Sequence, residues 1–221
     1  MNSIRNIIFD LGGVLLPVDY HAVIRAFGKL GVADAGSFYS QQAQQPLFDM
    51  FERGEISGGE FLFELKKLIP EASEAELIDA WNAILGSFPQ ERFSLLKKVR
   101  ENYRLFLLSN TNAIHISKFL EDLKVNNGVS DFPAYFEEVY YSFETGFRKP
   151  EKEIFELLML ENNLNYSETI FIEDTFSNVE GARAAGLPTL YLKVHEAEQI
   201  EDYFTAGGLL EMGRVSKALM A

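Results

Sequence analysis

Short apolar runs alternate along the chain with longer segments of amphipathic pattern. The first run, residues 4–9, ends at Asp10 and is followed by Leu11 and two glycines, which predicts a buried strand that enters a tight turn. Four later runs have the same character: residues 104–108, 137–141, 169–172 and 189–193. Because helical patterns lie between most of these runs, the sequence predicts an α/β fold, a doubly wound parallel sheet with helices on both faces.

Residues 19–87 interrupt this alternation with helical patterns and no convincing strand. Capping boxes beginning at Ser57 and Ser73 support helix starts there, because a hydroxyl and a carboxylate three residues later can satisfy free amide protons. Pro17 and Pro89 flank the segment and suit two linkers about which it could move as a unit. The predicted organisation is a core of residues 1–16 and 89–221 with a helical domain of residues 17–88 inserted into it.

Composition narrows the class of partner. With 221 residues, 47% of them hydrophobic, the chain can bury a full core. A net charge of -13 would repel nucleic acid and anionic membranes, so we expect a small-molecule partner, with no nucleic acid and no membrane. The first apolar run is too short to span a bilayer and no cleavage site follows it. We expect a cytoplasmic protein that is a monomer or a weak homodimer.

Polar residues stand where the predicted strands end, and in an open parallel sheet ligands bind beyond those ends. The polar residues are Asp10, Ser109, Asn110, Lys149, Glu173 and Asp174. Lys149 precedes a helix that we expect to begin at Pro150. Each residue alone is typical of a turn or a helix cap, and their shared placement is what indicates a site. Three carboxylates converging there would repel one another, and a bound cation would relieve the repulsion.

Magnesium is the cation that this ligand set favours, because it prefers oxygen ligands and is held by one or two carboxylates together with a substrate phosphate. The chain has no cysteine, and its three histidines are scattered, which argues against zinc. The histidines are His21, His115 and His195.

A metal-held phosphate that faces a carboxylate suits covalent phosphoryl transfer, in which Asp10 attacks phosphorus and water later cleaves the acyl phosphate. Ser109 and Lys149 would then bind the phosphoryl oxygens. A third capping box, from Ser177 to Glu180, predicts a helix start whose N-terminus adds positive potential near the anion.

Four ordered motifs resemble those of the haloacid dehalogenase superfamily, over nearly the whole chain. They are residues 7–15 (IIFDLGGVL), 107–112 (LLSNTN), 148–150 (RKP) and 170–174 (IFIED) with 178–182 (NVEGA). The resemblance implies a Rossmann-like core, a mobile helical cap and an aspartyl-phosphate intermediate. By this resemblance Asp10 is the nucleophile and a metal ligand, and Ser109, Asn110 and Lys149 bind the phosphoryl group. Glu173 and Asp174 would organise Mg²⁺.

Within that superfamily the sequence is similar to bacterial sugar-phosphate phosphatases that act on glucose 1-phosphate. The likeness lies in Asp-Leu-Gly, Ser-Asn-Thr-Asn and a cap segment at residues 51–57 (FERGEIS). In such relatives the loop at this cap position reaches the substrate. Arg53, Gly54 and Glu55 are therefore candidates for contacting the leaving group, and a plain interhelical turn is the alternative.

The sequence departs from the family pattern at Gly12, where most phosphatases of the superfamily carry an aspartate that protonates the leaving oxygen. A missing general acid costs on the order of 100-fold to 10,000-fold in rate for a poor leaving group. The carbonyl of Gly12 could still bind the metal. His115 is the candidate substitute acid or substrate contact, with a packing histidine as the alternative. Asn178 stands where many relatives have a further carboxylate.

The sequence thus predicts a magnesium-dependent phosphatase acting on a small phosphorylated metabolite such as glucose 1-phosphate. One alternative is a 2-haloacid dehalogenase, which uses the same nucleophile but no metal. The pair Glu173 and Asp174 argues against it, because a metal-free reaction needs no such ligands. Another is a binding or regulatory protein that keeps the fold without chemistry. A mutase is disfavoured because it normally needs the acid that Gly12 lacks.

Overall fold

A central parallel sheet organises the chain, as the alternation of strands and helices predicts. The structure is a computed structural model that describes residues 3–38 and 46–220. Its strands are β1 (Asn6–Phe9), β2 (Arg104–Ser109), β3 (Glu138–Tyr141), β4 (Thr169–Glu173) and β5 (Thr189–Tyr191). Every neighbouring pair is parallel, in the order β3-β2-β1-β4-β5. The first strand of the chain therefore lies at the centre of the sheet, and Asp10 follows its tip.

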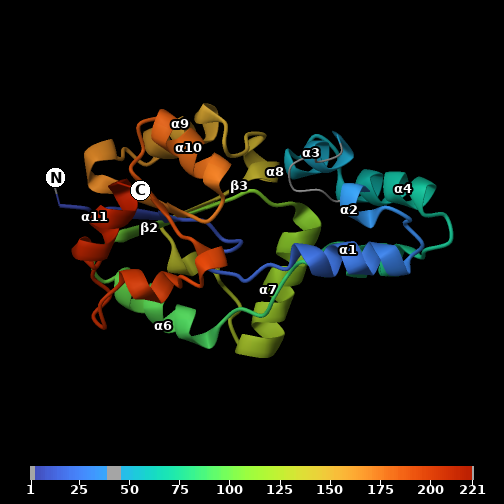
Figure 1. Cartoon of the computed structure of the whole chain (residues 1–221), viewed down its shortest axis with the longest axis horizontal. Helices are drawn as coiled ribbons and strands as arrows, with labels where there is room; N and C mark the ends of the chain where they lie inside the picture. The colour runs from blue at the N-terminus through green and yellow to red at the C-terminus, as the bar shows by residue number, and fades with distance from the viewer. Residues whose placement is uncertain (1–2, 39–45, 221) are drawn as a thin grey trace.

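Helices cover both faces of the sheet (Figure 1). They are α6 (Gln90–Val99), α7 (Ala113–Asn127) and α11 (Met212–Met220) on one face, and α9 (Lys152–Glu161) and α10 (Phe176–Ala184) on the other. Successive residues of a strand point to opposite faces, so Ile7 and Phe9 pack with α6 and α7 while Ile8 packs with α9. The doubly wound arrangement is confirmed. The connections include α8 (Ser142–Thr145), η1 (Pro133–Tyr135), η2 (Tyr166–Glu168), η3 (Val194–Glu196) and η4 (Ile200–Tyr203).

A group of helices between β1 and α6 lies to one side of the sheet (Figure 1). It consists of α1 (Tyr20–Lys29), α2 (Ala35–Phe38), α3 (Pro46–Glu52), α4 (Gly58–Leu68) and α5 (Glu74–Asn82). These helices, called the cap below, bury their own hydrophobic cluster, whose largest members include Phe61 and Trp81. The capping boxes at Ser57 and Ser73 are both formed, which confirms the two predicted helix starts.

The two connections between cap and core run side by side. Val18 and Leu85 form an antiparallel bridge, and the amide of Asp19 donates to the carbonyl of Ile84 at 2.9 Å. Gly86 donates to the carbonyl of Pro17 at 2.9 Å. The backbone polar groups of the linkers thus satisfy one another at the edge of the cavity described below.

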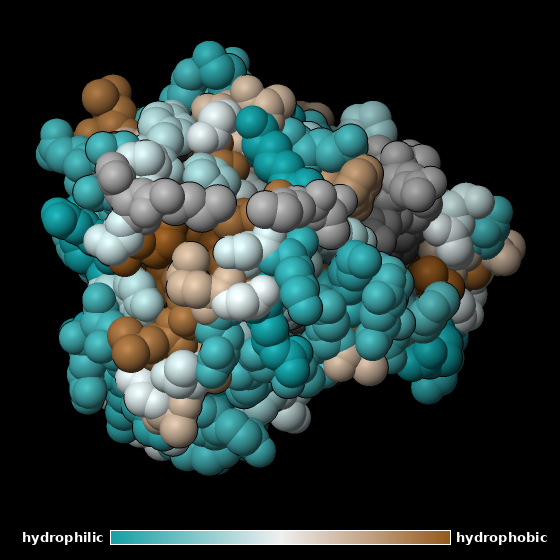
Figure 2. Space-filling model, turned by 60° about the vertical axis from the view of Figure 1, so that its left-hand side comes forward, coloured by the Kyte–Doolittle hydropathy of each residue, from teal (hydrophilic) through white to brown (hydrophobic). Residues whose placement is uncertain are grey.

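The surface matches the acidic composition. Most of the face shown in Figure 2 is hydrophilic, with apolar side chains in a few patches. Among the helices in the described part of the chain, none combines the length and the apolar character that crossing a bilayer requires.

Candidate active site

Three carboxylates meet at the carboxyl ends of β1 and β4. Asp10 directly follows β1, and its amide donates to the carbonyl of Ile172 at 3.0 Å, which fixes it beside the end of β4. Glu173 and Asp174 stand at that end, and each of the three residues offers an oxygen within 4.8 Å of the others'. The predicted convergence of Asp10, Glu173 and Asp174 is present in the structure.

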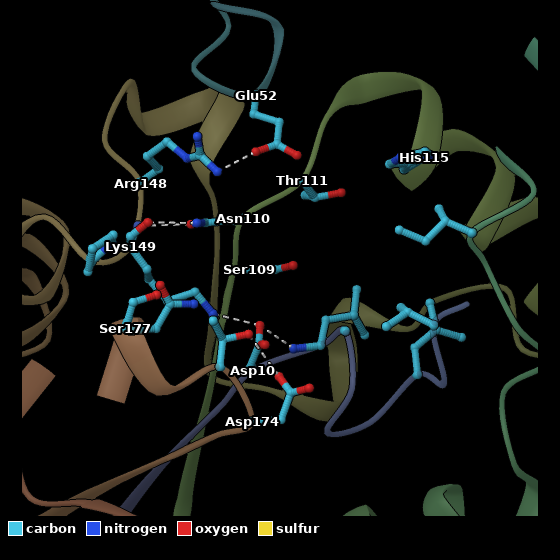
Figure 3. A pocket seen from close by; sticks show the side chains of 18 of the residues that line it. Asp10, Glu52, Ser109, Asn110, Thr111, His115, Arg148, Lys149, Asp174 and Ser177 are labelled. Atoms are coloured by element: carbon cyan, nitrogen blue, oxygen red, sulfur yellow. Dashed lines mark hydrogen bonds and ion pairs between the residues drawn. The ribbon is translucent and has the colours of Figure 1, made fainter. Parts of the chain in front are cut away.

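Lys149 lies between two of these carboxylates. Its Nζ atom is 2.7 Å from Asp10 Oδ1 (Figure 3). It is also 2.7 Å from Glu173 Oε2 and donates to the carbonyl of Leu108 at 3.1 Å. The side chain is almost fully buried. Burial by itself would lower the pKa of Lys149, but the charges of Asp10 and Glu173 outweigh it and raise that pKa. The ammonium group therefore stays charged at the base of the cavity.

One lysine does not balance the acidic cluster. Burial, followed by the charge of Glu173, raises the pKa of Asp10 well above its usual range, and the same two causes raise the pKa of Asp174 to about 7. A further cation at this point would stabilise the ionised carboxylates. The donors are oxygens only, and Gly12 lines the same cavity as Asp10 and Asp174. This donor set fits magnesium, as the sequence predicts.

Gly13 allows Asp174 to approach the loop after β1. Its φ is +78°, and a Cβ atom at this position would lie 1.9 Å from Asp174 Oδ2. Any other residue would push that carboxylate away from Asp10 or strain the backbone. The second glycine of the Asp-Leu-Gly-Gly sequence thus has a steric reason connected with the cation site.

Ser109 and Asn110 lie on the β2 side of the cavity. Ser109 is buried and lines the cavity beside Asp10. The amide of Asn110 is used differently: its Nδ2 donates to the Lys149 carbonyl at 2.8 Å, and its Oδ1 accepts from the Lys149 amide at 2.9 Å. Asn110 therefore holds the main chain of Lys149 in place, a positioning contact that the expectation of a direct phosphate ligand did not include.

The helix after Asp174 begins earlier than predicted, so the third capping box is wrong. Helix α10 starts at Phe176, and Ser177 already lies in its first turn. Just before the helix, Glu173 Oε1 accepts from the amides of Asp174 (3.1 Å) and Thr175 (2.9 Å) and so fixes the turn that leads into α10. The helix N-terminus does border the cavity, where Thr175 and Ser177 are lining residues.

The helix after Lys149 begins later than predicted. Helix α9 starts at Lys152 with Glu151 as its N-cap residue, not at Pro150. A turn precedes it, because the Glu151 amide donates to the Arg148 carbonyl at 2.9 Å and Glu151 Oε2 accepts from the Arg148 amide at 3.2 Å. This turn places the carboxylate of Glu151 at the cavity.

Only part of the cap loop after α3 lines the cavity. Arg53 lines it, with its guanidinium paired to Asp49 and Glu151. Gly54 packs on the core, since a Cβ there would lie 2.0 Å from the carbonyl oxygen of Phe143. Glu55 is exposed and is not among the lining residues. Of the three predicted leaving-group contacts, the described structure brings only Arg53 to the cavity.

His115 lines the cavity but is not a proton donor near neutral pH. It stacks on Trp81 of the cap at a centroid distance of 4.9 Å, and its Nδ1 is 2.9 Å from Asn82 Oδ1. Burial lowers the pKa of His115 to about 3. The expectation that its pKa suits proton donation is therefore wrong, because the buried imidazole stays neutral. A contact with the substrate remains a prediction.

The cavity has a volume of about 360 Å³ and lies between cap and core. Its lining includes residues that sequence reasoning did not select as site residues, notably Tyr20, Glu52, Thr111, Arg148 and Glu151. Glu52 reaches in from the cap to pair with Arg148 at the end of the cavity away from Asp10 (Figure 3). Arg148 stands in the recognised Arg-Lys-Pro motif, so a signal existed for it. Glu52 lies in the cap segment of residues 51–57 that carries the resemblance, but its pairing with Arg148 could not be predicted because it depends on how the cap packs on the core.

Comparison with known proteins finds a matching family and several similar proteins. Residues 4–186 match the family of haloacid dehalogenase-like hydrolases. The D-ribitol-5-phosphate phosphatase of Bacteroides thetaiotaomicron is 31% identical over 84% of this chain and 90% of its own. The phosphorylated carbohydrates phosphatase of Thermotoga maritima is 24% identical over 92% and 91%. A haloacid dehalogenase family enzyme of B. thetaiotaomicron, solved as a magnesium complex, superposes with a TM-score of 0.77, 31% identity and coverage of 86% and 93%.

Proposed function

The chain belongs to the haloacid dehalogenase-like hydrolases, and we propose that within this family it is a magnesium-dependent phosphatase of a small phosphorylated carbohydrate, with Asp10 as nucleophile. The observation that carries the proposal is the contact of Asp10 with Lys149 at 2.7 Å beside the cluster of Asp10, Glu173 and Asp174. A nucleophilic carboxylate, a buried ammonium group and a cation site share one end of a cavity that can hold a small ester.

Each of these residues has its own role in the proposed reaction. An oxygen of Asp10 attacks phosphorus, the bond from phosphorus to the leaving oxygen breaks, and an aspartyl phosphate forms. Lys149 and Ser109 bind the phosphoryl oxygens, and Asn110 keeps Lys149 in position through its main chain. Water then attacks the phosphorus, releases phosphate and restores the Asp10 carboxylate. Asp10, Asp174 and the carbonyl of Gly12 would hold magnesium, which would supply positive charge to the phosphoryl group.

Gly12 occupies the position from which an aspartate would protonate the leaving oxygen, and glycine has no side chain to do so. His115 does not replace it, because its pKa of about 3 keeps it neutral at the pH of the reaction. A leaving oxygen that is a weak base loses least from this lack. The oxygen at the anomeric carbon of a sugar is a weaker base than a primary alkoxide, which favours glucose 1-phosphate as the substrate. D-ribitol 5-phosphate is the second candidate, from the substrate named for a relative.

A phosphate-release screen tests the proposal. Wild-type protein is assayed with magnesium or with EDTA against sugar phosphates, polyol phosphates and nucleotides, beside Asp10→Asn and the surface variant Asp122→Asn. We expect release from carbohydrate monophosphates, loss with EDTA, a fall of at least about 1,000-fold in Asp10→Asn and no change in Asp122→Asn. Phosphate release that survives in Asp10→Asn would contradict the assigned nucleophile. Chloride release from 2-chloropropionate in EDTA would favour a dehalogenase instead.

A further inference from the structure

Five charged side chains join the cap to the core at the end of the cavity away from Asp10. They are Asp49, Glu52 and Arg53 of the cap and Arg148 and Glu151 of the core, called the cap-core ion network below. Arg53 Nε is 2.9 Å from Asp49 Oδ2, and its two terminal nitrogens pair with the two carboxylate oxygens of Glu151. Arg148 pairs with Asp49 and, at 2.7 Å, with Glu52 Oε2.

The network contains more negative than positive charge. Two guanidinium groups face three carboxylates, and each guanidinium is already paired with two of the three. Hydrogen bonds from Arg148 and Arg53 outweigh burial and lower the pKa of Asp49, and the hydrogen bond from Arg53 lowers that of Glu151. The carboxylates of Asp49 and Glu151 therefore remain ionised at neutral pH. With Glu52 counted as the ionised partner of Arg148, the five groups carry a net charge of about -1.

The network stands where a leaving group must lie. Four of its members, all but Asp49, line the cavity whose other end holds Asp10 and Lys149. In Figure 3 Glu52 and Arg148 lie at one end, Asp10 and Asp174 at the other, and Ser109 and Thr111 between them. A phosphoryl group seated on Lys149 thus directs the rest of the ester toward the network.

We propose that the cap-core ion network restricts this enzyme to phosphate monoesters whose leaving group is uncharged and hydroxylated, and that it rejects esters with a second anionic group. The inference rests on the proposed phosphatase function and narrows its substrate class. Hydroxyl groups donate hydrogen bonds to carboxylates, so a sugar or polyol is accommodated. A second phosphate or a carboxylate meets a surplus negative charge and finds both arginines of the lining engaged.

The size of the effect follows from Coulomb's law. Two like charges about 6 Å apart at an effective dielectric constant of 20 repel enough to weaken binding 100-fold. Solvent that reaches the partly exposed side chains reduces this repulsion, so we expect the wild type to discriminate by about tenfold or more. Removing one carboxylate neutralises the network and should remove most of the discrimination.

Glucitol 6-phosphate and gluconate 6-phosphate form a matched pair of probes, since they differ only in a terminal hydroxymethyl group or carboxylate. Their inhibition constants are measured with magnesium against hydrolysis of p-nitrophenyl phosphate, by wild type, Glu52→Gln, Asp49→Asn and the exposed control Glu121→Gln. We expect gluconate 6-phosphate to bind about tenfold more weakly to wild type and to Glu121→Gln. In Glu52→Gln and Asp49→Asn the ratio should fall to about twofold. Added salt should lower the wild-type ratio as well.

The outcomes separate the two proposals. Equal inhibition constants in the wild type, or an unchanged ratio in both Glu52→Gln and Asp49→Asn, overturn the charge filter and leave the phosphatase function standing. Two variants are used because either one alone can alter the fit of the cap. If the wild type does not hydrolyse p-nitrophenyl phosphate at all, the phosphatase function fails, and the inference fails with it.

Discussion

The pKa values of two buried bases of this cavity, Lys149 and His115, shift in opposite directions. Lys149 lies against Asp10 and Glu173, whose charges raise its pKa despite burial. His115 has the neutral amide of Asn82 as its side-chain partner, so nothing offsets burial and its pKa falls to about 3. The charge of a buried residue is thus decided by partners distant in the sequence.

The depressed pKa of His115 predicts a pH dependence of stability. In the unfolded chain a histidine has a pKa of about 6.5, so below this pH the unfolded state binds a proton that the folded state refuses. The stability that His115 contributes is present above pH 6.5 and is lost as pH falls toward 3. The loss reaches about 1.4 kcal/mol per pH unit. Urea unfolding of His115→Asn between pH 7 and pH 5 should show a shallower decline than the wild type.

The exposed His21 supplies the control for this measurement. His21→Asn should keep the wild-type slope, because solvent surrounds this side chain in the folded protein as it does in the unfolded chain. Only slopes are compared, since His115→Asn also changes the packing against Trp81. Parallel profiles for the wild type and His115→Asn would show that the imidazole is protonated in the folded protein.

Individual site residues were predictable to the extent that strand ends converge. Asp10, Glu173 and Asp174 end strands that pair directly, so sequence position and sheet topology bring them together. Glu52 and Glu151 carry no such signal, since one lies on the cap and the other in a turn, and each meets an arginine of the opposite domain. Contacts that depend on how a cap rests on a core are not encoded in local patterns.

At the scale of elements, the capping boxes give a direct comparison. Ser57 and Ser73 form theirs, each exchanging hydrogen bonds with the glutamate three residues later. Ser177 has the same pattern and forms no box, because α10 begins at Phe176 and Ser177 already lies in its first turn. The local pattern alone therefore does not determine where a helix begins. The sheet and the helical character of the cap depend on longer patterns and were predictable.

Substitution of the capping serines should reproduce that difference. Ser57→Ala removes a formed cap from α4 and should lower the free energy of unfolding by about 1 kcal/mol. Ser177→Ala removes no cap and should change it by less than about 0.5 kcal/mol. Urea unfolding monitored by circular dichroism, with EDTA present, measures both. Equal losses in the two variants would mean that α10 begins at Ser177 in solution.

The loop between α3 and α4 can be tested through Gly54. Gly54 has φ +68°, and its lack of a side chain lets it touch the carbonyl of Phe143. Gly54→Ala should destabilise the protein by about 1 kcal/mol through its backbone conformation alone. The clash should also displace Arg53 and raise KM more than it lowers kcat. Gly59→Ala, in the open first turns of α4, is the control and should not destabilise the protein. An unchanged KM in Gly54→Ala would argue against a close fit of this loop to the core.

At the scale of the whole molecule, the cap and the core meet at a polar and aromatic junction. The cap has its own cluster, and the sheet has one on each face. Trp81 belongs to the cap cluster, but its Nε1 donates to Asn112 Oδ1 of the core at 3.2 Å and its ring stacks on His115. Cap and core are therefore joined by buried contacts near α5 and α7 as well as by the ion network on the other side.

This junction predicts that cap and core unfold together. Trp81 is the single tryptophan of the chain, so its fluorescence reports on the cap side of the junction, whereas circular dichroism reports on the whole fold. The proposed magnesium ligands, Asp10 and Asp174 among them, belong to the core, and at a free concentration of 100 Kd the ion should stabilise the folded state by about 2.7 kcal/mol. If the domains are coupled, both signals shift to higher urea by the same amount, and both shifts shrink in Asp174→Asn. A magnesium shift seen by circular dichroism but absent from Trp81 fluorescence would mean that the cap unfolds separately, with the buried junction too weak to hold it to the core.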